Sequence, residues 1–463
     1  MNIPLRARLA TVTVGALAVA VVCAGAVSAQ SLEQAMASAY RTNTQLLAQR
    51  ASLRATDENV PQALSNWRPQ VSVSGQIGVA ADSQTSNGGF QGANSGSRVP
   101  RQAQLTVTQP VYRGGRTVAQ TSQAENQVLA ARAQLDAIEQ SVFTDVVTAY
   151  ANVLTNQAVL ELNQSNVQVL TRQFEAARDR FQVGEVTRTD VAQSESRLAR
   201  ARADVIQAQG NLDVARTNFF RVVGEQPARL SAIRLPPNLP GTLDAAATTA
   251  ATANPNVVAA QFNEVAAQDN VRLILGELLP AVSVQGQLTH GEDTQTRNVV
   301  RDTGQVVAQV TMPLYSSGSV ESRVRQARQV ANQRRIETEN ARRIAREQAT
   351  QAFLALTTAR ARVRALLTQI RAQEIALDGV EQEARVGSRT VLDVLDAEQE
   401  LLNAKVTLVQ TQRDEVLANF QLASATGRLT ARELRLPVDL YDPTQNYNQV
   451  RTRWFGFGIN PGQ

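Results

Sequence analysis

The sequence predicts a mainly α-helical fold in which long antiparallel coiled-coil hairpins are joined to a small membrane β part. It also predicts an internal two-fold structural repeat. Three observations predict this fold. Two nearly identical strand-like segments begin at Pro69 and Pro280, 211 residues apart. Two other stretches of about 65 residues lack proline and have apolar residues at coiled-coil spacing. Only 4% of the 463 residues are aromatic, which suits long helices better than one large globular core.

The N-terminus has the pattern of a secretory signal peptide covering residues 1–29. Arg6 and Arg8 precede an apolar run over residues 9–22, and small residues lead to a cleavage point near Ala29. We therefore expect the protein to be exported.

The remaining composition excludes several classes of protein. The single cysteine, Cys23, lies inside the signal segment behind two valines that fit a lipoprotein signal badly, so we expect no lipid anchor, disulfide or cysteine metal ligand. Without the two signal arginines, 44 basic residues face 41 acidic ones with no basic block, and nucleic acid is not implied. No later stretch approaches the ~20 apolar residues of a transmembrane helix, so any membrane part must consist of strands.

Matching motifs in the two halves define the domain organisation. The segments "VTQPVYRGG" and "VTMPLYSSG" correspond, as do "VGEVTRTDV" and "VGSRTVLDV", both at an offset of 203 residues. We divide the chain into the signal peptide, a first repeat (30–225), a proline-rich linker (226–241), a second repeat (242–429) and a C-terminal tail (430–463).

Each repeat contains two predicted strands, at about 69–80 and 101–112 and at about 280–290 and 304–315. Apolar residues alternate in them with small polar ones, which predicts one dry and one wet face. The dry, lipid-facing set comprises Val71, Val73, Ile77, Val79, Leu105, Val107, Val282, Val284, Leu288, Val306 and Val310.

The strands of each pair are connected by polar, glycine-containing segments, 83–97 and 291–298, which we expect to be exposed loops. A strand of about 9–11 residues crosses a bilayer when tilted. Four strands cannot close around water, so a lumen would require several chains. The alternative is a pair of soluble, half-buried hairpins, but two matched hairpins in an exported chain favour the membrane.

The helical stretches predict hairpins. Helices are expected near 116–181, 187–223, 320–384 and 390–426, with tip turns at 183–190 and 386–393. At 1.5 Å per residue the longer helices would span about 100 Å. A periplasmic coiled-coil adaptor without a pore is the alternative, and the strands argue against it. A passive porin would have no use for so many helical residues.

Polar residues concentrate at the tip turns. Thr187 and Asp190, and Thr390 and Asp393, have the spacing of a capping box at the start of a helix. Asp396 lies one turn after Asp393 on the same helix face and has no capping role.

No catalytic or cofactor-binding constellation stands out in the sequence. His290 is the only histidine and Lys405 the only lysine, and neither a metal-spacing nor a phosphate-loop motif is present. His290 is expected to be solvated at a strand end. The sequence therefore predicts neither an enzyme nor a cofactor.

Nearly the whole mature chain resembles the TolC family of outer-membrane efflux and secretion channels. The resemblance runs from "SLEQAMASAYRTNTQLLAQRASL" through "FQVGEVTRTDVAQSESRLARA" to "EARVGSRTVLDVLDAEQELLNAK", which is the most specific segment. It implies a homotrimer in which each protomer gives four strands to a twelve-stranded β-barrel, continued by an α-helical tunnel that tapers shut in the periplasm. The tail "GRLTARELRLPVDLYDPTQNYNQVRTRW" is similar to members associated with type I protein secretion.

The resemblance also assigns roles at the tips. It matches Asp393 and Asp396 to the constriction aspartates of the family, which in a trimer form two stacked carboxylate rings that concentrate cations. It matches Arg389 to a latch residue that ties the closed tip to Thr189 or Asp190. A tyrosine that joins this latch in other members corresponds here to Ala384.

The same resemblance implies docking of a membrane-fusion adaptor at the tip motifs. These comprise Val183, Gly184 and Glu185, and Val386, Gly387 and Ser388. The two glycines also suit the left-handed backbone of a tight turn, which is compatible with docking.

From these features we expect an outer-membrane exit channel that extends into the periplasm of a Gram-negative cell. Its expected partners are two sister subunits, a periplasmic adaptor, an inner-membrane ABC or proton-driven pump, and outer-membrane lipid. The sequence leaves the cargo open between a protein, a drug and a polysaccharide.

Overall fold

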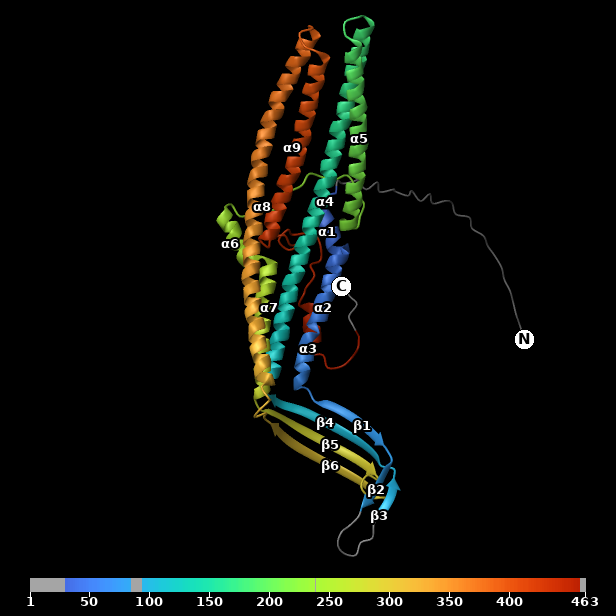
Figure 1. Cartoon of the computed structure of the whole chain (residues 1–463), viewed down its shortest axis with the longest axis vertical. Helices are drawn as coiled ribbons and strands as arrows, with labels where there is room; N and C mark the ends of the chain where they lie inside the picture. Colours follow the sequence, from blue (N-terminus) through green and yellow to red (C-terminus); the bar gives the residue numbers. More distant parts are fainter. Residues whose placement is uncertain (1–29, 85–93, 238, 459–463) are drawn as a thin grey trace, which may run out of the picture.

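A computed structural model describes residues 30–84, 94–237 and 239–458, and shows an elongated molecule with two helical hairpins above a small sheet (Figure 1). The predicted signal peptide and its cleavage point near Ala29 lie outside the described residues. The mainly helical fold with a small β part and a repeated plan is confirmed.

Two very long helices form the frame of the molecule. α4 (Arg116–Gln182) and α8 (Ser319–Arg385) each contain 67 residues. The chain then turns back into α5 (Arg188–Val223), which packs along α4, and α9 (Val391–Ala425), which packs along α8. The sequence predicted every one of these ends to within two residues.

Shorter helices flank the lower halves of α4 and α8 in both repeats. They are α1 (Leu32–Thr42), α2 (Thr44–Asp57), α3 (Asn59–Leu64), α6 (Leu243–Ala253), α7 (Pro255–Leu275) and α10 (Gln445–Val450), with 3-10 turns at Ser65–Trp67 and Gly276–Leu278. The first three pack on α4 and α6 packs on α8, whereas α7 lies between the two long helices and packs on both.

The largest buried cluster lies halfway along α4. Phe143 and Tyr150 are completely buried there against Phe219 of α5 and Met36 of α1. Leucines and alanines of the C-terminal segment cover the same cluster. We call this cluster the equatorial core, because it joins both ends of the chain to the middle of the long helices.

The sheet consists of four antiparallel strands in the order β1-β4-β5-β6. Their bounds are β1 (Gln70–Ile77), β4 (Arg101–Arg113), β5 (Ala281–Glu292) and β6 (Val300–Thr311). The register places Val73 opposite Leu105 and Leu105 opposite Leu288. Since directly paired side chains point to the same face, the apolar residues share one face of the sheet, as predicted.

Three expectations about the β part were wrong. The last strand was expected at 304–315 but β6 ends at Thr311, because Pro313 has no N–H with which to continue a ladder. The strand starts earlier, in polar residues that show no alternation. Val79 was expected on the first strand but lies beyond β1, where the N–H of Gly78 donates to Pro100 and the chain turns away.

The third wrong expectation is the loop at 83–97. The structure has a second antiparallel hairpin there, β2 (Ala80–Gln84) with β3 (Asn94–Arg98), on either side of residues outside the described part. Strands can pair through their backbones without alternating apolar residues. The polar, glycine-rich sequence of this segment therefore gave no indication of the hairpin.

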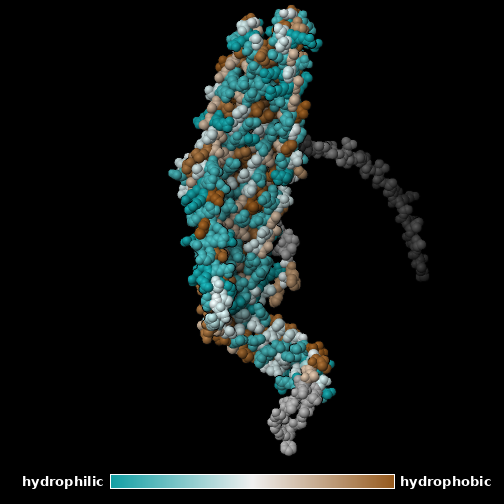
Figure 2. Space-filling view, in the orientation of Figure 1, coloured by the Kyte–Doolittle hydropathy of each residue, from teal (hydrophilic) through white to brown (hydrophobic). Residues whose placement is uncertain are grey.

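The helical surface in the view of Figure 2 is largely hydrophilic. Within the described ranges, no helix combines the length and the apolar character that would let it cross a membrane.

Candidate functional site: the hairpin tips

The two tip turns have the same backbone geometry. Gly184 and Gly387 have φ angles of +83° and +81°, a left-handed conformation that favours glycine. After each glycine, the N–H of Glu185 donates to Arg180 and that of Ser388 to Glu383, both at 2.9 Å. Each long helix is thereby closed by a tight turn that presents the predicted docking motif at its end.

Each returning helix starts with a capping box. The N–H of Asp190 donates to the Thr187 hydroxyl at 3.3 Å, and the Thr187 N–H donates to the Asp190 carboxylate at 2.9 Å. Thr390 and Asp393 repeat this arrangement at 3.3 and 3.0 Å. The predicted capping boxes are therefore present at both tips.

The capping bonds also set the charge of the second tip. The backbone N–H and the hydroxyl of Thr390 both donate to the Asp393 carboxylate, and Arg389 lies nearby. These contacts hold the pKa of Asp393 below its ordinary value. Asp393 is therefore a partly exposed, ionised carboxylate in the first turn of α9.

Asp396 has a partner that the sequence did not predict. Arg197 of α5 donates from Nη2 to Asp396 Oδ1 at 2.6 Å. The side chain of Asp396 is 56% exposed and that of Arg197 is 30% exposed. The ion pair joins the first hairpin to the second across 199 positions of sequence.

An apolar cluster near this ion pair packs the two hairpins together. Leu170 of α4, Leu198 and Ala201 of α5 and Leu395 of α9 are buried in it, with Val391 packed at its side. The first turns of α9 thus lie against both helices of the other hairpin. We call this contact the tip cluster.

Arg389 pairs within its own turn. Its Nε donates to Glu383 at 2.9 Å, and within the described chain it bonds to neither Thr189 nor Asp190. The predicted latch therefore does not form inside one subunit, and a latch between subunits stays a prediction.

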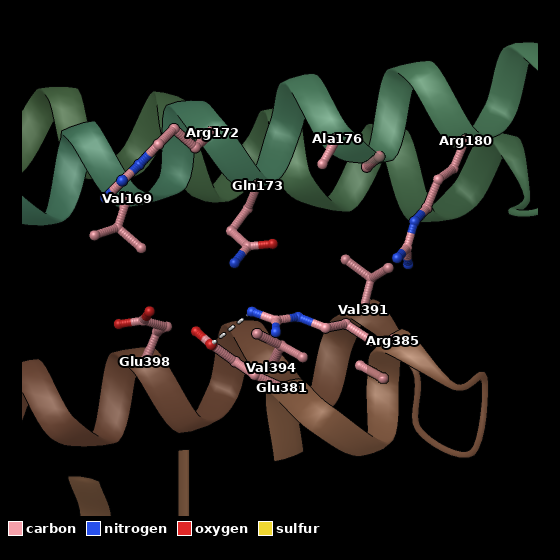
Figure 3. Close-up of a pocket in the computed structure, with 12 residues that line it drawn as sticks. Val169, Arg172, Gln173, Ala176, Arg180, Glu381, Arg385, Val391, Val394 and Glu398 are labelled. Atoms are coloured by element: carbon pink, nitrogen blue, oxygen red, sulfur yellow. Dashed lines mark ion pairs between the residues drawn. The ribbon is translucent and has the colours of Figure 1, made fainter. Parts of the chain in front are cut away.

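A cavity of about 440 Å³ lies between the hairpins near the tips (Figure 3). Arg172 and Arg180 of α4 line it on one side. Glu381, Arg385 and Glu398 line it on the other, with Arg385 and Glu381 paired at 3.8 Å. The hairpins are thus close at the tip cluster and separated by a charged cavity beside it.

Two residues of the lining, Glu398 and Ala384, distinguish this cavity. Burial raises the pKa of Glu398, and the nearby Glu381 raises it further. Ala384 contributes only a methyl group to the lining.

A second polar cluster, missed by sequence reasoning, ties the C-terminal tail to the equatorial core. The Ala431 N–H donates to Glu139 of α4 at 2.6 Å, and burial raises the pKa of Glu139 to about 7. The Arg50 guanidinium lies over the rings of Tyr40 and Tyr441, at 4.3 and 5.1 Å from their centroids. These residues fasten the tail across the middle of the molecule.

The only histidine and the only lysine each contact a carboxylate. His290 is exposed at the far end of the sheet and bonds to Asp302 at 2.6 Å, and Lys405 pairs with Glu374 at 3.0 Å. Among the residues that the structure describes, no three histidine, aspartate or glutamate side chains converge to hold a metal ion.

Paired hairpins about 100 Å long, standing on an antiparallel sheet with one apolar face, define a class of protein, the membrane channel subunit with a long helical extension. The comparisons with known proteins give the family. The chain belongs to the outer membrane efflux protein family, whose model matches residues 35–225 and 247–428.

Individual relatives agree with this family. The chain is 33% identical to outer membrane efflux protein BepC of Brucella suis over 94% of its length and 93% of that protein. It is 26% identical to outer membrane protein TolC of Escherichia coli, over 88% and 84%. The solved CmeC outer membrane channel of Campylobacter jejuni has the same fold, with a TM-score of 0.76 at 14% identity over 91% and 89%.

These matches confirm the resemblance stated from the sequence. The protein is an outer-membrane efflux or secretion channel of the Gram-negative type.

Proposed function

We propose that three copies of this chain form an exit channel by joining their sheets edge to edge into a twelve-stranded barrel. The observation that carries the proposal is the sheet itself. β1 and β6 are open edges, and every residue in both is exposed. Open edges invite pairing with another chain, and closure into a barrel removes them.

The exposed apolar face supports a lipid environment for this barrel. Val73, Ile77 and Val306 expose 77%, 70% and 78% of their surface on one face of the sheet. In water such a face would be a site of aggregation, whereas in a bilayer it is the outer wall of a barrel. The opposite, polar face would then line the pore.

The hairpin tips are proposed to form the periplasmic gate. Ionised Asp393 gives three carboxylates around a threefold axis, which attract cations and impede anions. Arg389 is proposed to exchange its Glu383 contact for Thr189 or Asp190 of the next subunit when the gate closes. The tip motifs around Gly184 and Gly387 are proposed to receive a periplasmic adaptor, which links the channel to an inner-membrane ABC or proton-driven pump.

Cross-linking of the sheet edges tests the assembly. Ser74 of β1 and Thr303 of β6 lie in one row on the polar face, three strand spacings apart, so about 14 Å separates them within one chain. This is too far for a disulfide, and residues 30–463 contain no cysteine. We expect cysteine pairs scanned around Ser74→Cys and Thr303→Cys to give covalent dimers and trimers in detergent.

Each single-cysteine variant is the control, since it can give at most a linked dimer. A detergent-purified protein that stays monomeric, and whose edge cysteines never cross-link between chains, would exclude the barrel.

A further inference from the structure

We propose that Arg197 is a positioning residue of the gate, which holds the two hairpins of one subunit together and neutralises Asp396 until the tip opens. This rests on the proposed function of the tips. It also assigns different roles to the two tip aspartates, which the sequence had treated alike.

The contact geometry supports a specific ion pair. The distance from Arg197 Nη2 to Asp396 Oδ1 is 2.6 Å, which is short for a hydrogen bond between charged groups. The two residues come from α5 and α9, which belong to different hairpins. The bond therefore breaks if the hairpins separate, unlike the capping bonds, which lie within one helix start.

The surroundings place this bond at the edge of the contact between the hairpins. Leu198, next to Arg197, and Leu395, next to Asp396, are both buried in the tip cluster. The charged cavity lined by α4, α8 and α9 lies beside it (Figure 3). The polar contact between α5 and α9 thus lies at one edge of the apolar tip cluster, which also borders the charged cavity through Val391.

The electrostatic consequence follows from this position. Asp393 keeps its charge in either state, because its capping partner Thr390 moves with it. Asp396 is compensated by Arg197 only while the hairpins touch. Opening of the tip therefore uncovers a second ring of negative charge, so the open pore selects cations more strongly than the closed one.

The test is the conductance and ion selectivity of the full-length channel in planar bilayers. An exposed ion pair is worth little, so we expect Arg197→Gln to raise resting conductance about two- to fivefold for each bridge broken, and to increase cation selectivity. Arg197→Lys should restore most of the wild-type behaviour. Arg200→Gln is the matched control, because Arg200 is exposed on the same helix and pairs with no carboxylate in the described part of the chain.

Exchanging the charges at positions 197 and 396 distinguishes the loss of this ion pair from other effects of the substitutions. Arg197→Glu and Asp396→Arg alone each place like charges together and should open the gate. The double variant should return to low resting conductance, with weakened cation selectivity because the ring at position 396 is now basic. Trimer formation on gels verifies that every variant is assembled.

The outcomes separate this inference from the proposed function. If wild-type protein conducts but Arg197→Gln behaves as Arg200→Gln does, or the exchanged pair fails to restore closure, Arg197 is not a gate residue and the channel stands. If the wild-type protein forms no pore at all, the proposed function itself fails.

Discussion

Phe143, in the middle of α4, is completely buried, whereas Phe181, near the end of the same helix, exposes 44% of its surface. The equatorial core around Phe143 joins five helices and the tail, whereas the tip cluster joins three helices through a few leucines and one exposed ion pair. Opening the equatorial core would expose many large apolar side chains, whereas separating the hairpins at the tip would expose only a few leucines. The proposed gate therefore lies where fewer apolar contacts have to be broken.

The largest expected difference between the regions is in stability. Phe143→Ala should lower the free energy of unfolding by about 3–5 kcal/mol, because it leaves a cavity in the equatorial core. Phe181→Ala should cost less than about 1 kcal/mol. Urea or thermal unfolding of the two variants in detergent measures this, and equal losses would remove the distinction between core and tip.

The next largest effect concerns pH. The pKa of Glu139 is about 7 in the folded protein and near 4.5 in the unfolded chain, so folding favours its protonated form. This contribution is complete below pH 4.5 and is lost as pH rises through 7, by up to about 3 kcal/mol. Glu139→Gln keeps an acceptor for the Ala431 N–H and should be the more stable protein at pH 8.

Unfolding curves of the wild-type protein and Glu139→Gln between pH 5 and 8 measure this effect. The gap between them should widen up to about pH 7, because the unfolded chain releases the Glu139 proton that the folded protein keeps, and should then level off. Parallel curves would mean that folding does not raise the pKa of Glu139.

A smaller effect distinguishes the two aspartates of the tip. Because Asp396 is paired with Arg197, Asp393→Asn should lower the cation-to-anion permeability ratio of the resting pore more than Asp396→Asn does, by more than about twofold. Reversal potentials in a salt gradient give the ratio. Equal effects of the two changes would argue against compensation of Asp396.

The smallest expected effect is that of Arg389→Ala. Its Glu383 contact is exposed, so the resting conductance should rise by less than about fivefold, if the latch to the next subunit exists. Single-channel recording detects such a rise. A mutant pore as closed as the wild type would exclude Arg389 from the latch.

The sequence predicted those elements that depend on residues close together in the chain, such as turns, helix caps and alternating strands. Gly184 and Gly387 follow the ends of the long helices, and the two Thr–Asp capping boxes mark where the returning helices begin, as the structure shows. Alternation predicted the apolar face of the sheet for the same reason. It failed for β2, β3 and the first residues of β6, where pairing occurs between polar residues.

Long-range polar contacts could not be predicted in this way. Arg197 meets Asp396 only because two hairpins lie at a particular rotation about their axes, which no spacing within either segment records. Glu139 and Arg50 resemble any exposed charged residues of a helix until the tail folds back over them. The turns in the sequence thus located the candidate gate, but the ion pair between Arg197 and Asp396 could not be predicted from it.

Amide hydrogen exchange along α4 tests the contrast between core and tip most directly, because this one helix passes through both regions. In the assembled trimer we expect amides near residues 143–153 to be strongly protected, and protection to fall progressively towards residues 170–182. Uniform protection along the helix, or faster exchange in the middle than at the tip, would contradict a gate that opens on a fixed equatorial core.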